Sequence, residues 1–278
     1  MTLRGGRVAA VTVAVLLAGV ASGFALHAAD TRNGVKSPGD KPILLELFTS
    51  EGCSSCPTVD VWAERLDRLQ PIQGAEIIVL SEHVNYWDHD GWKDPFSSSQ
   101  LTARQFGYEQ IMGIGSAYTP QVILNGDQEL NVQNSNAQIR QTFEKAAMQP
   151  MLPVNLSLVT MGAGELTGRV AVDATSDKRG GDVFVAVALD RTQTDVLAGE
   201  NGGKKLTNIG VVKDLVRVGK LEKGKSFEEP FTVKLWPGAE AGNLRVVAFV
   251  QGKDLGKVMG AAMTKEVGKG TAHDQGME

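Results

Sequence analysis

The sequence predicts an α/β protein in which a strand–helix–strand–helix–hairpin–helix segment is followed by a mainly-β segment. Three observations support this prediction. A cysteine pair lies between a strand-like and a helix-like run, an Asn-Gly turn separates two short runs, and short glycine-separated strands dominate after residue 150. With 278 residues, the chain is long enough for one large or two ordinary domains.

The first elements place the two cysteines of the chain, Cys53 and Cys56, between a strand and a helix. The run 43–48 is typical of a short buried strand, and apolar residues at helical spacing follow until Pro71 ends the helix. Pro57 fits the first turn of that helix, where a proline loses no intrahelical hydrogen bond. A Cys-x-x-Cys pair in this context is the redox element of thioredoxin-like folds.

The elements that follow keep the thioredoxin order, with a long excursion after the second strand. Asn125-Gly126 between two short runs is a strong hairpin signal. Ser135 and Gln138 form a potential capping box for the last helix of this segment. The predicted elements are a parallel strand at 76–80, a helix at 97–112, strands at 121–124 and 127–132, and a helix from Ser135 to about Ala147.

The prolines at 150 and 153 mark a domain boundary, and short strands separated by glycine-rich turns follow it. This pattern predicts a small, mainly antiparallel β-sandwich. The run 211–218 is compatible with either a helix or a strand. The predicted organisation is a signal peptide or N-terminal anchor (1–28), a polar spacer (29–40), a thioredoxin-like domain (41–149), a mainly-β domain (150–263) and a disordered tail (264–278).

The N-terminus predicts export. Arg4 and Arg7 precede a stretch, 8–26, that has no charged residue, and small residues follow near position 28. The apolar stretch also approaches membrane-spanning length, so an uncleaved anchor is the alternative to a cleaved signal. Removing residues 1–28 deletes two arginines and no acid, which changes the formal charge from −4 to −6. The net negative charge of the protein does not favour binding to the negatively charged nucleic-acid backbone.

The cysteine pair favours a redox couple over a structural disulfide. The N-terminus of a helix stabilises a thiolate, and we expect Cys53 to be the more exposed and more acidic thiol. A disulfide that spans three residues closes a small loop and therefore stabilises the fold little. Zinc binding is not expected, because the four histidines do not complete a four-ligand site with the cysteines. No metal or organic cofactor is implied.

Two further candidates are Thr119-Pro120 and Glu46. In thioredoxin-like proteins a cis-proline lies opposite the cysteine pair, and the hairpin after Pro120 favours that geometry over a trans proline that starts an edge strand. Glu46 is an acid in an otherwise apolar strand, seven residues before Cys53. If buried, it could transfer protons for the second cysteine, and if not, it faces solvent or a lysine.

The segment after the second strand supplies His83 and Asp88, together with several aromatic residues. It leaves the carboxyl end of a strand, where ligands meet open α/β sheets, so we expect at least His83 to lie near Cys53. The alternative is a histidine hydrogen-bonded within the loop. The aromatic residues of this segment (Trp87, Trp92 and Phe96) are expected to pack the loop onto the core.

The stretch LELFTSEGCSSCP (45–57) resembles a bacterial family of exported thioredoxin-like proteins catalogued as a domain of unknown function. The pattern continues in HVNYWD (83–88), GWKDPF (91–96), YTPQ (118–121) and GEN (199–201) with LT (206–207). The resemblance covers residues 42–262 and implies a thioredoxin-like fold and export, without an established reaction. Asn85 departs from the pattern, where an aspartate is expected.

The sequence therefore predicts an exported thiol–disulfide oxidoreductase that acts on envelope proteins, with Cys53 as the attacking thiolate and Cys56 as the resolving thiol. The alternative is a non-catalytic envelope binding protein with a structural disulfide. The expected partners are protein thiols or disulfides and a redox partner. The sequence does not distinguish a reductant from an oxidant or an isomerase.

Overall fold

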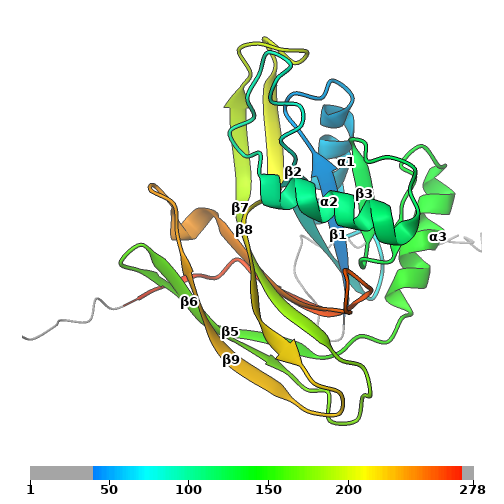
Figure 1. Cartoon of the computed structure of the whole chain (residues 1–278), viewed down its shortest axis with the longest axis vertical. Coiled ribbons are helices and arrows are strands. Elements are labelled where there is room, and N and C mark those ends of the chain that lie inside the picture. Colours follow the sequence, from blue (N-terminus) through cyan, green and yellow to red (C-terminus); the bar gives the residue numbers. More distant parts are fainter. Residues whose placement is uncertain (1–39, 271–278) are drawn as a thin grey trace, which may run out of the picture. The chain divides into compact units, whose positions relative to one another are not determined.

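The computed structural model describes residues 40–270, which belong to one compact unit. The predicted signal segment, 1–28, lies outside the described residues. Within the described part, the secondary-structure order predicted for the first half of the chain is confirmed (Figure 1). Its elements are β1 (Lys41–Thr49), α1 (Cys56–Leu69), β2 (Ala75–His83), α2 (Ser99–Met112), β3 (Gln121–Leu124), β4 (Gln128–Glu129) and α3 (Asn136–Ala147).

Local sequence signals set the ends of these elements. The Ser98 hydroxyl accepts a hydrogen bond from the amide of Gln100 at the start of α2, and Gly113 ends that helix with a φ of 66°. The predicted capping box is confirmed, because Ser135 and Gln138 bond each other's backbone amides at the start of α3.

The strands of the first half form one part of a larger sheet. β1 pairs in parallel with β2 and antiparallel with β3, which forms the predicted hairpin with β4. Alternate residues of β1 face opposite sides of the sheet. Leu45 and Leu47 pack with residues of α1 and α3, whereas Phe48 packs with Tyr108 of α2. The helices therefore cover both faces of this part of the sheet.

The sequence predicts a mainly-β domain in the second half, but the strands of this half are divided between two sheets. Four of its strands join the first half in one eight-stranded sheet of order β11-β10-β7-β8-β2-β1-β3-β4. The junction is a parallel pairing of Ser81 with Val211. Gly210 beside it has a φ of 59°, and any side chain there would collide with the Val79 carbonyl. The joining strands are β7 (Gly181–Asp195), β8 (Lys205–Leu221), β10 (Leu244–Gln251) and β11 (Val258–Thr264).

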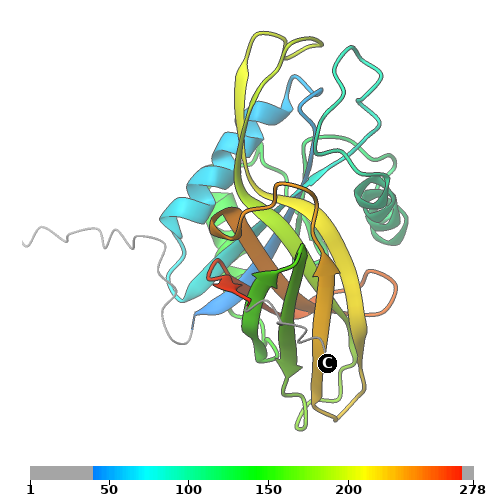
Figure 2. The same ribbon diagram turned by 90° about the vertical axis from the view of Figure 1, so that its left-hand side faces the viewer.

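The ambiguous run 211–218 is therefore a strand, within β8. The remaining strands form a four-stranded sheet of order β12-β5-β6-β9 that packs against the large sheet, as a sandwich requires (Figure 2). Val170 and Phe231 of the small sheet share one core with Val185 and Val246 of the large sheet. The strands of the small sheet are β5 (Val154–Gly162), β6 (Glu165–Val172), β9 (Phe227–Lys234) and β12 (Gly268–Lys269), and a 3-10 turn (Ala241–Asn243) precedes β10.

The sequence predicts a disordered tail from residue 264, but residues 268 and 269 form β12. β12 pairs in parallel with β5, through Gly268 and Thr160, so the ordered chain continues past that point. Between residues 40 and 270, no helix is long and apolar enough to cross a membrane.

Candidate functional site

The two cysteines lie where β1 passes into α1, and they form a disulfide. The turn from Ser50 to Ser55 connects the strand to the helix, and Cys56 is the first residue of the helix. Both cysteine side chains are fully buried. The expectation that Cys53 is the more exposed of the two is therefore wrong for the disulfide form. The physical reason is that two segments distant in sequence close over the turn.

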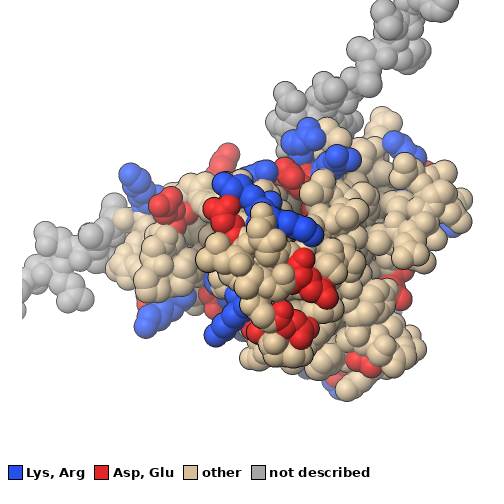
Figure 3. All heavy atoms as spheres, turned by 90° about the horizontal axis from the view of Figure 1, so that it is seen from above, with Lys and Arg blue, Asp and Glu red and all other residues tan. Residues whose placement is uncertain are grey.

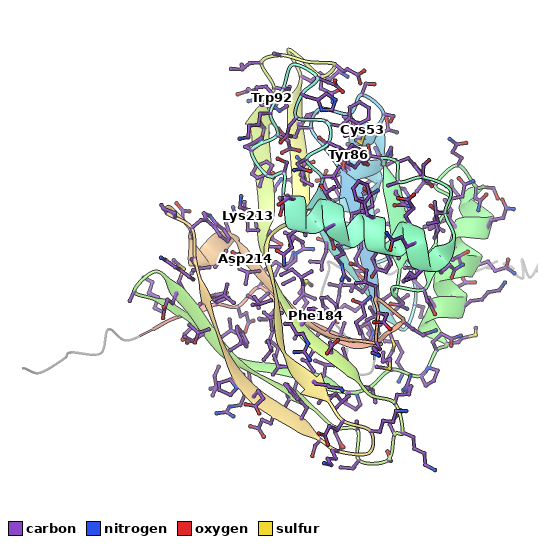
Figure 4. All side chains as sticks on the ribbon, in the orientation of Figure 1. Cys53, Tyr86, Trp92, Phe184, Lys213 and Asp214 are labelled. Atoms are coloured by element: carbon purple, nitrogen blue, oxygen red, sulfur yellow. A yellow bond between two sulfur atoms is a disulfide. The ribbon has the colours of Figure 1, made fainter. Side chains whose placement is uncertain are left out.

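The first of these segments is the loop after β2, with its aromatic residues. Trp87 packs on Gly52, where an added Cβ would come within 3.0 Å of the Trp87 Cβ. The Trp87 indole also donates a 2.8 Å hydrogen bond to the Thr119 hydroxyl. Tyr86 stacks on Phe106 of α2 at 6.3 Å. Figure 4 shows Cys53 and Tyr86 at the same end of the sheet. Trp87 packs against the core cluster of Phe48 and Ile123, as expected for an aromatic residue of this loop.

The second segment is the tip of the β7–β8 hairpin, residues 196–204. The fully buried Asn201 side chain donates hydrogen bonds to the carbonyls of Glu51 and Cys53, at 2.8 and 2.9 Å. The backbone of Gly199 lies against that of Gly91, so the two covering segments also contact each other. Sequence reasoning included residues 199–201 only as part of a family pattern and gave them no place at the site.

Thr119-Pro120 lies at the same edge of the sheet. The peptide bond is cis, as expected. Gln121, the next residue, begins β3 and pairs with Phe48, one residue before the end of β1. Thr119 reaches the cysteine turn through Trp87, which bonds to it and packs on Gly52. An aromatic side chain thus connects this dipeptide to the cysteine turn, and direct contact of Pro120 with the cysteine pair stays a prediction.

Asp60 is another residue of this site that sequence reasoning missed. It lies one helical turn after Cys56, on the same face of α1, and is buried. Its carboxylate accepts a 2.8 Å hydrogen bond from the Thr49 hydroxyl. Burial raises the pKa of Asp60 to about 7, although Thr49 and the nearby His83 favour the ionised form. The sequence signal that could have identified Asp60 is an aspartate on the apolar face of an amphipathic helix, four residues after a cysteine.

His83 lies in the same buried polar cluster as Asp60. Its Nδ1 lies 2.7 Å from the Asp94 carboxylate, and its ring packs edge-on against Phe96. Burial alone would lower the pKa of His83, but Asp94, Asp60 and Glu51 outweigh it and raise the pKa. The contacts of His83 thus match the alternative of a histidine bonded within the loop.

Asp94 connects this loop to the cysteine turn. Its Oδ2 also accepts a 2.8 Å hydrogen bond from the amide of Glu51, two residues before Cys53. Burial alone would raise the pKa of Asp94, but His83 and backbone amides lower it, so this carboxyl is ionised. Asp88 supports the loop through bonds from Ser97 and from the Asp94 amide. The structure therefore gives Asp88 a role in loop packing.

The Glu51 carboxyl is buried beneath the turn. Burial and the neighbouring Asp94 raise its pKa, while hydrogen bonds, including one from the Trp92 indole at 3.1 Å, oppose the rise. Trp92 lies near the hairpin tip in Figure 4. The turn therefore has buried acidic groups behind it on both the helix and the loop sides.

Glu46 is buried, but it faces α2 and not the cysteine helix. Arg104 of α2 forms an ion pair with it, and the Tyr108 hydroxyl donates a 2.7 Å hydrogen bond to it. Its neighbours Leu45 and Leu47 face α1 instead. The side chain therefore faces neither solvent nor a lysine, and the fold gives the place of a buried acid near the cysteines to Asp60.

Across residues 40–270, no group of three or more histidine, cysteine or acidic side chains is arranged to hold a metal ion. Viewed from the end that carries the cysteine turn, basic and acidic side chains are interspersed among other residues (Figure 3).

The fold and the site define a mixed α/β protein with a disulfide at a strand–helix junction, covered by segments from both halves of the chain. The chain belongs to the family described as protein of unknown function DUF1223, whose model matches residues 44–251. The resemblance to a family catalogued as a domain of unknown function is thereby confirmed. No curated protein matched the sequence.

Solved structures give one broad similarity. The X-ray structure of protein AGR_C_4864 from Agrobacterium tumefaciens is 26% identical, with a TM-score of 0.59, and the match covers 84% of this chain and 97% of that one. Two partial similarities are weaker. The sporulation control protein Spo0M from Bacillus subtilis is 14% identical, with a TM-score of 0.29, over 44% of this chain and 49% of its own. The protein CsgH from R. palustris is 12% identical, with a TM-score of 0.20, over 41% and 90%. Neither bears on fold or function.

Proposed function

We propose that the protein is an exported thiol–disulfide oxidoreductase of the cell envelope, and that residues 41–149 form a thioredoxin-like unit. The observation that carries the proposal is the disulfide at the N-terminus of α1, with the Asp60 carboxyl buried one turn behind it. The helix N-terminus favours a thiolate at Cys53. A carboxyl with a pKa of about 7 is suited to exchange a proton at neutral pH.

In the reducing direction, the Cys53 thiolate attacks a substrate disulfide, and one substrate sulfur leaves as a thiolate. Asp60 then accepts the proton of Cys56, whose thiolate attacks the Cys53 sulfur and releases the second substrate thiolate. Two electrons pass from the cysteine pair to the substrate. In the oxidising direction the same steps run in reverse, and Asp60 returns the proton to Cys56.

A binding protein with a structural disulfide is the second candidate, and one observation favours it. Both cysteines are fully buried in the disulfide form, so a substrate sulfur reaches them only if the covering loops move. The small size of the disulfide loop argues against this candidate, because such a bridge adds little stability. Export rests on the N-terminal sequence, which lies outside the described residues.

The test is to trap the mixed disulfide in living cells. Cys56→Ser leaves Cys53 able to form a mixed disulfide with a substrate protein but unable to resolve it. We expect this variant to accumulate disulfide-linked complexes that are visible on non-reducing gels. The complexes should disappear when the sample is treated with a reductant before electrophoresis.

The matched control is Cys53→Ser, which keeps the single buried thiol of Cys56 and should trap few or no partners. Equal trapping by the two variants, or trapping by neither, would contradict an exchange reaction that begins at Cys53. The proteins recovered with Cys56→Ser would also identify the substrates.

A further inference from the structure

The tip of the β7–β8 hairpin brings a carboxylate to the residue between the two cysteines. The Glu200 Oε2 accepts a 3.0 Å hydrogen bond from the backbone amide of Ser54. Asn201, next to it, is fully buried and holds the carbonyls of Glu51 and Cys53. The position of Glu200 is therefore fixed by a buried neighbour, although the Glu200 side chain itself is exposed.

The carboxylate is ionised at neutral pH. Hydrogen bonds from the hydroxyl and the amide of Ser54 lower the pKa of Glu200, and the charge of Lys204 lowers it further. Lys204 bonds mainly to Asn201, with its Nζ 2.8 Å from the Asn201 Oδ1. A negative charge thus lies beside the peptide unit that follows Cys53.

We propose that Glu200 is a positioning residue that shifts the balance of the cysteine couple toward the disulfide. The inference rests on the proposed function and extends it, because it assigns part of the redox site to the second half of the chain. It uses a motif, GEN at 199–201, that the exchange mechanism itself does not require.

The physical argument concerns the reduced form. Backbone amides at the N-terminus of a helix stabilise an anion, and the Cys53 thiolate is the anion expected there. Glu200 accepts the hydrogen bond of the Ser54 amide, which is then not free to stabilise the thiolate. Its carboxylate also places a second negative charge next to the thiolate. Both effects destabilise the thiolate, and with it the reduced form, whereas the neutral disulfide is little affected. Stabilising the reduced form makes a couple more oxidising, so Glu200 acts in the opposite direction.

Other charged groups also border the turn, and the test must separate them from Glu200. Glu51 lies within the turn and Asp60 lies on α1, both buried. The His83–Asp94 pair is bonded to the Glu51 amide through Asp94. These groups stay in place when the exposed Glu200 is changed, and Lys204 keeps its bond to Asn201.

The experiment compares Glu200→Gln with the wild-type chain in glutathione redox buffers. The glutamine keeps the shape and one acceptor oxygen but removes the charge. We expect the equilibrium constant to shift three- to tenfold toward the dithiol, where a tenfold change corresponds to about 30 mV for a two-electron couple. In the reduced variant, Cys53 should also react faster with iodoacetamide at pH 6, because more of it is thiolate.

The matched control is Asp195→Asn, which removes an equal charge from the same hairpin. Asp195 is exposed and pairs with Lys205, and it makes no bond to the cysteine turn. Unchanged redox equilibria in Glu200→Gln, a shift toward the disulfide, or an equal shift in Asp195→Asn would each overturn the proposal. Melting temperatures confirm that all three proteins are folded.

The outcomes also separate this proposal from the proposed function. A wild-type potential in the range of oxidoreductases, with no effect of Glu200→Gln, would refute the role of Glu200 and leave the exchange reaction standing. A wild-type potential below about −300 mV would refute the exchange reaction, whatever Glu200→Gln does.

Discussion

Asp60→Asn is expected to slow resolution of the mixed disulfide at pH 7 by about 100-fold. Without the carboxylate, the Cys56 thiol has no buried base to accept its proton, and general-base catalysis typically contributes about 10²–10⁴-fold. The measurement follows the reduced protein after it is mixed with oxidised glutathione. Formation of the mixed disulfide at Cys53 should proceed nearly as in the wild type, while its decay slows. Equal decay rates in both proteins would show that Asp60 takes no part in proton transfer.

The same variant should change how stability depends on pH. The pKa of Asp60 rises from 3.8 in the unfolded chain to about 7 in the folded protein, so the folded state binds this proton more tightly. Its contribution to stability is full below about pH 4 and is lost as the pH rises to 7. At about 1.36 kcal/mol per pH unit, the loss is on the order of 4 kcal/mol.

Urea unfolding between pH 4 and pH 7 tests this prediction. The fall in the free energy of unfolding over that range should be much smaller in Asp60→Asn than in the wild type. Glu64→Gln is the matched control, because Glu64 lies on the same helix and pairs with the exposed Arg191. Parallel pH profiles for Asp60→Asn and the wild type would contradict the assigned pKa.

Arg104→Met is expected to lower the free energy of unfolding by about 3–5 kcal/mol. Arg104 is buried between α2 and β10, where it pairs with Glu46 and bonds to the side chains of Tyr108 and Gln251. Removing the guanidinium leaves Glu46 as a buried charge without its cation, and breaking a buried ion pair from one side costs about this much. Urea denaturation measures the loss.

Two further variants sharpen the measurement. Arg140→Met removes an exposed partner of Glu144 and should cost less than about 1 kcal/mol. The double variant Arg104→Met with Glu46→Gln should recover part of the loss, because it removes the stranded charge as well. If the double variant is as unstable as the sum of the single ones, the two side chains are not coupled as the structure indicates.

A second buried acid, Glu82, lies beside the ion pair of Arg104 and Glu46. Burial and the neighbouring Glu46 raise the pKa of Glu82 well above its usual value, and Arg104 does not fully compensate. Burial and the neighbouring Glu46 therefore favour the protonated form of Glu82, which reduces the repulsion between the two acids. Because its folded pKa is raised, Glu82 also loses its stabilising contribution as the pH rises.

The order of elements in the first half could be predicted because its signals are local. The apolar run of β1, the proline in the first turn of α1, the Asn125-Gly126 turn and the Ser135 capping box each depend on a few adjacent residues. The site at the cysteine turn was predictable for the same reason, since strand, cysteines and helix are contiguous in sequence.

The union of the two halves could not be predicted, because it depends on contacts between distant residues. The pairing of Ser81 with Val211 spans 130 positions and involves a single register point. The local sequence signal for this pairing is Gly210, which permits the close approach to Val79. In the sequence it cannot be distinguished from any other glycine in a strand. The change in strand pattern near residue 150 therefore predicts a domain boundary and does not reveal the sheet that the two halves share.

The same distinction between local signals and distant contacts applies to the site residues. His83 was expected near Cys53 because neighbouring parallel strands end at one edge, and its strand does so, with Thr49 opposite it. The ring is bonded to Asp94, eleven residues on, and no local pattern indicates that partner. Proximity of the His83 ring to Cys53 stays a prediction. Predicting a role for Asp60 would have required knowing that the face of α1 that carries it is buried against the sheet.

The reduction potential of the Cys53–Cys56 pair tests the central claim most directly. The described protein, with its N-terminal segment removed, is equilibrated in defined glutathione or dithiothreitol buffers, and the fraction of disulfide is read after acid quenching and alkylation. Thiol–disulfide exchange as a function predicts a value between about −270 and −120 mV, the range of known oxidoreductases. A value below about −300 mV would identify a structural disulfide and contradict the proposed function.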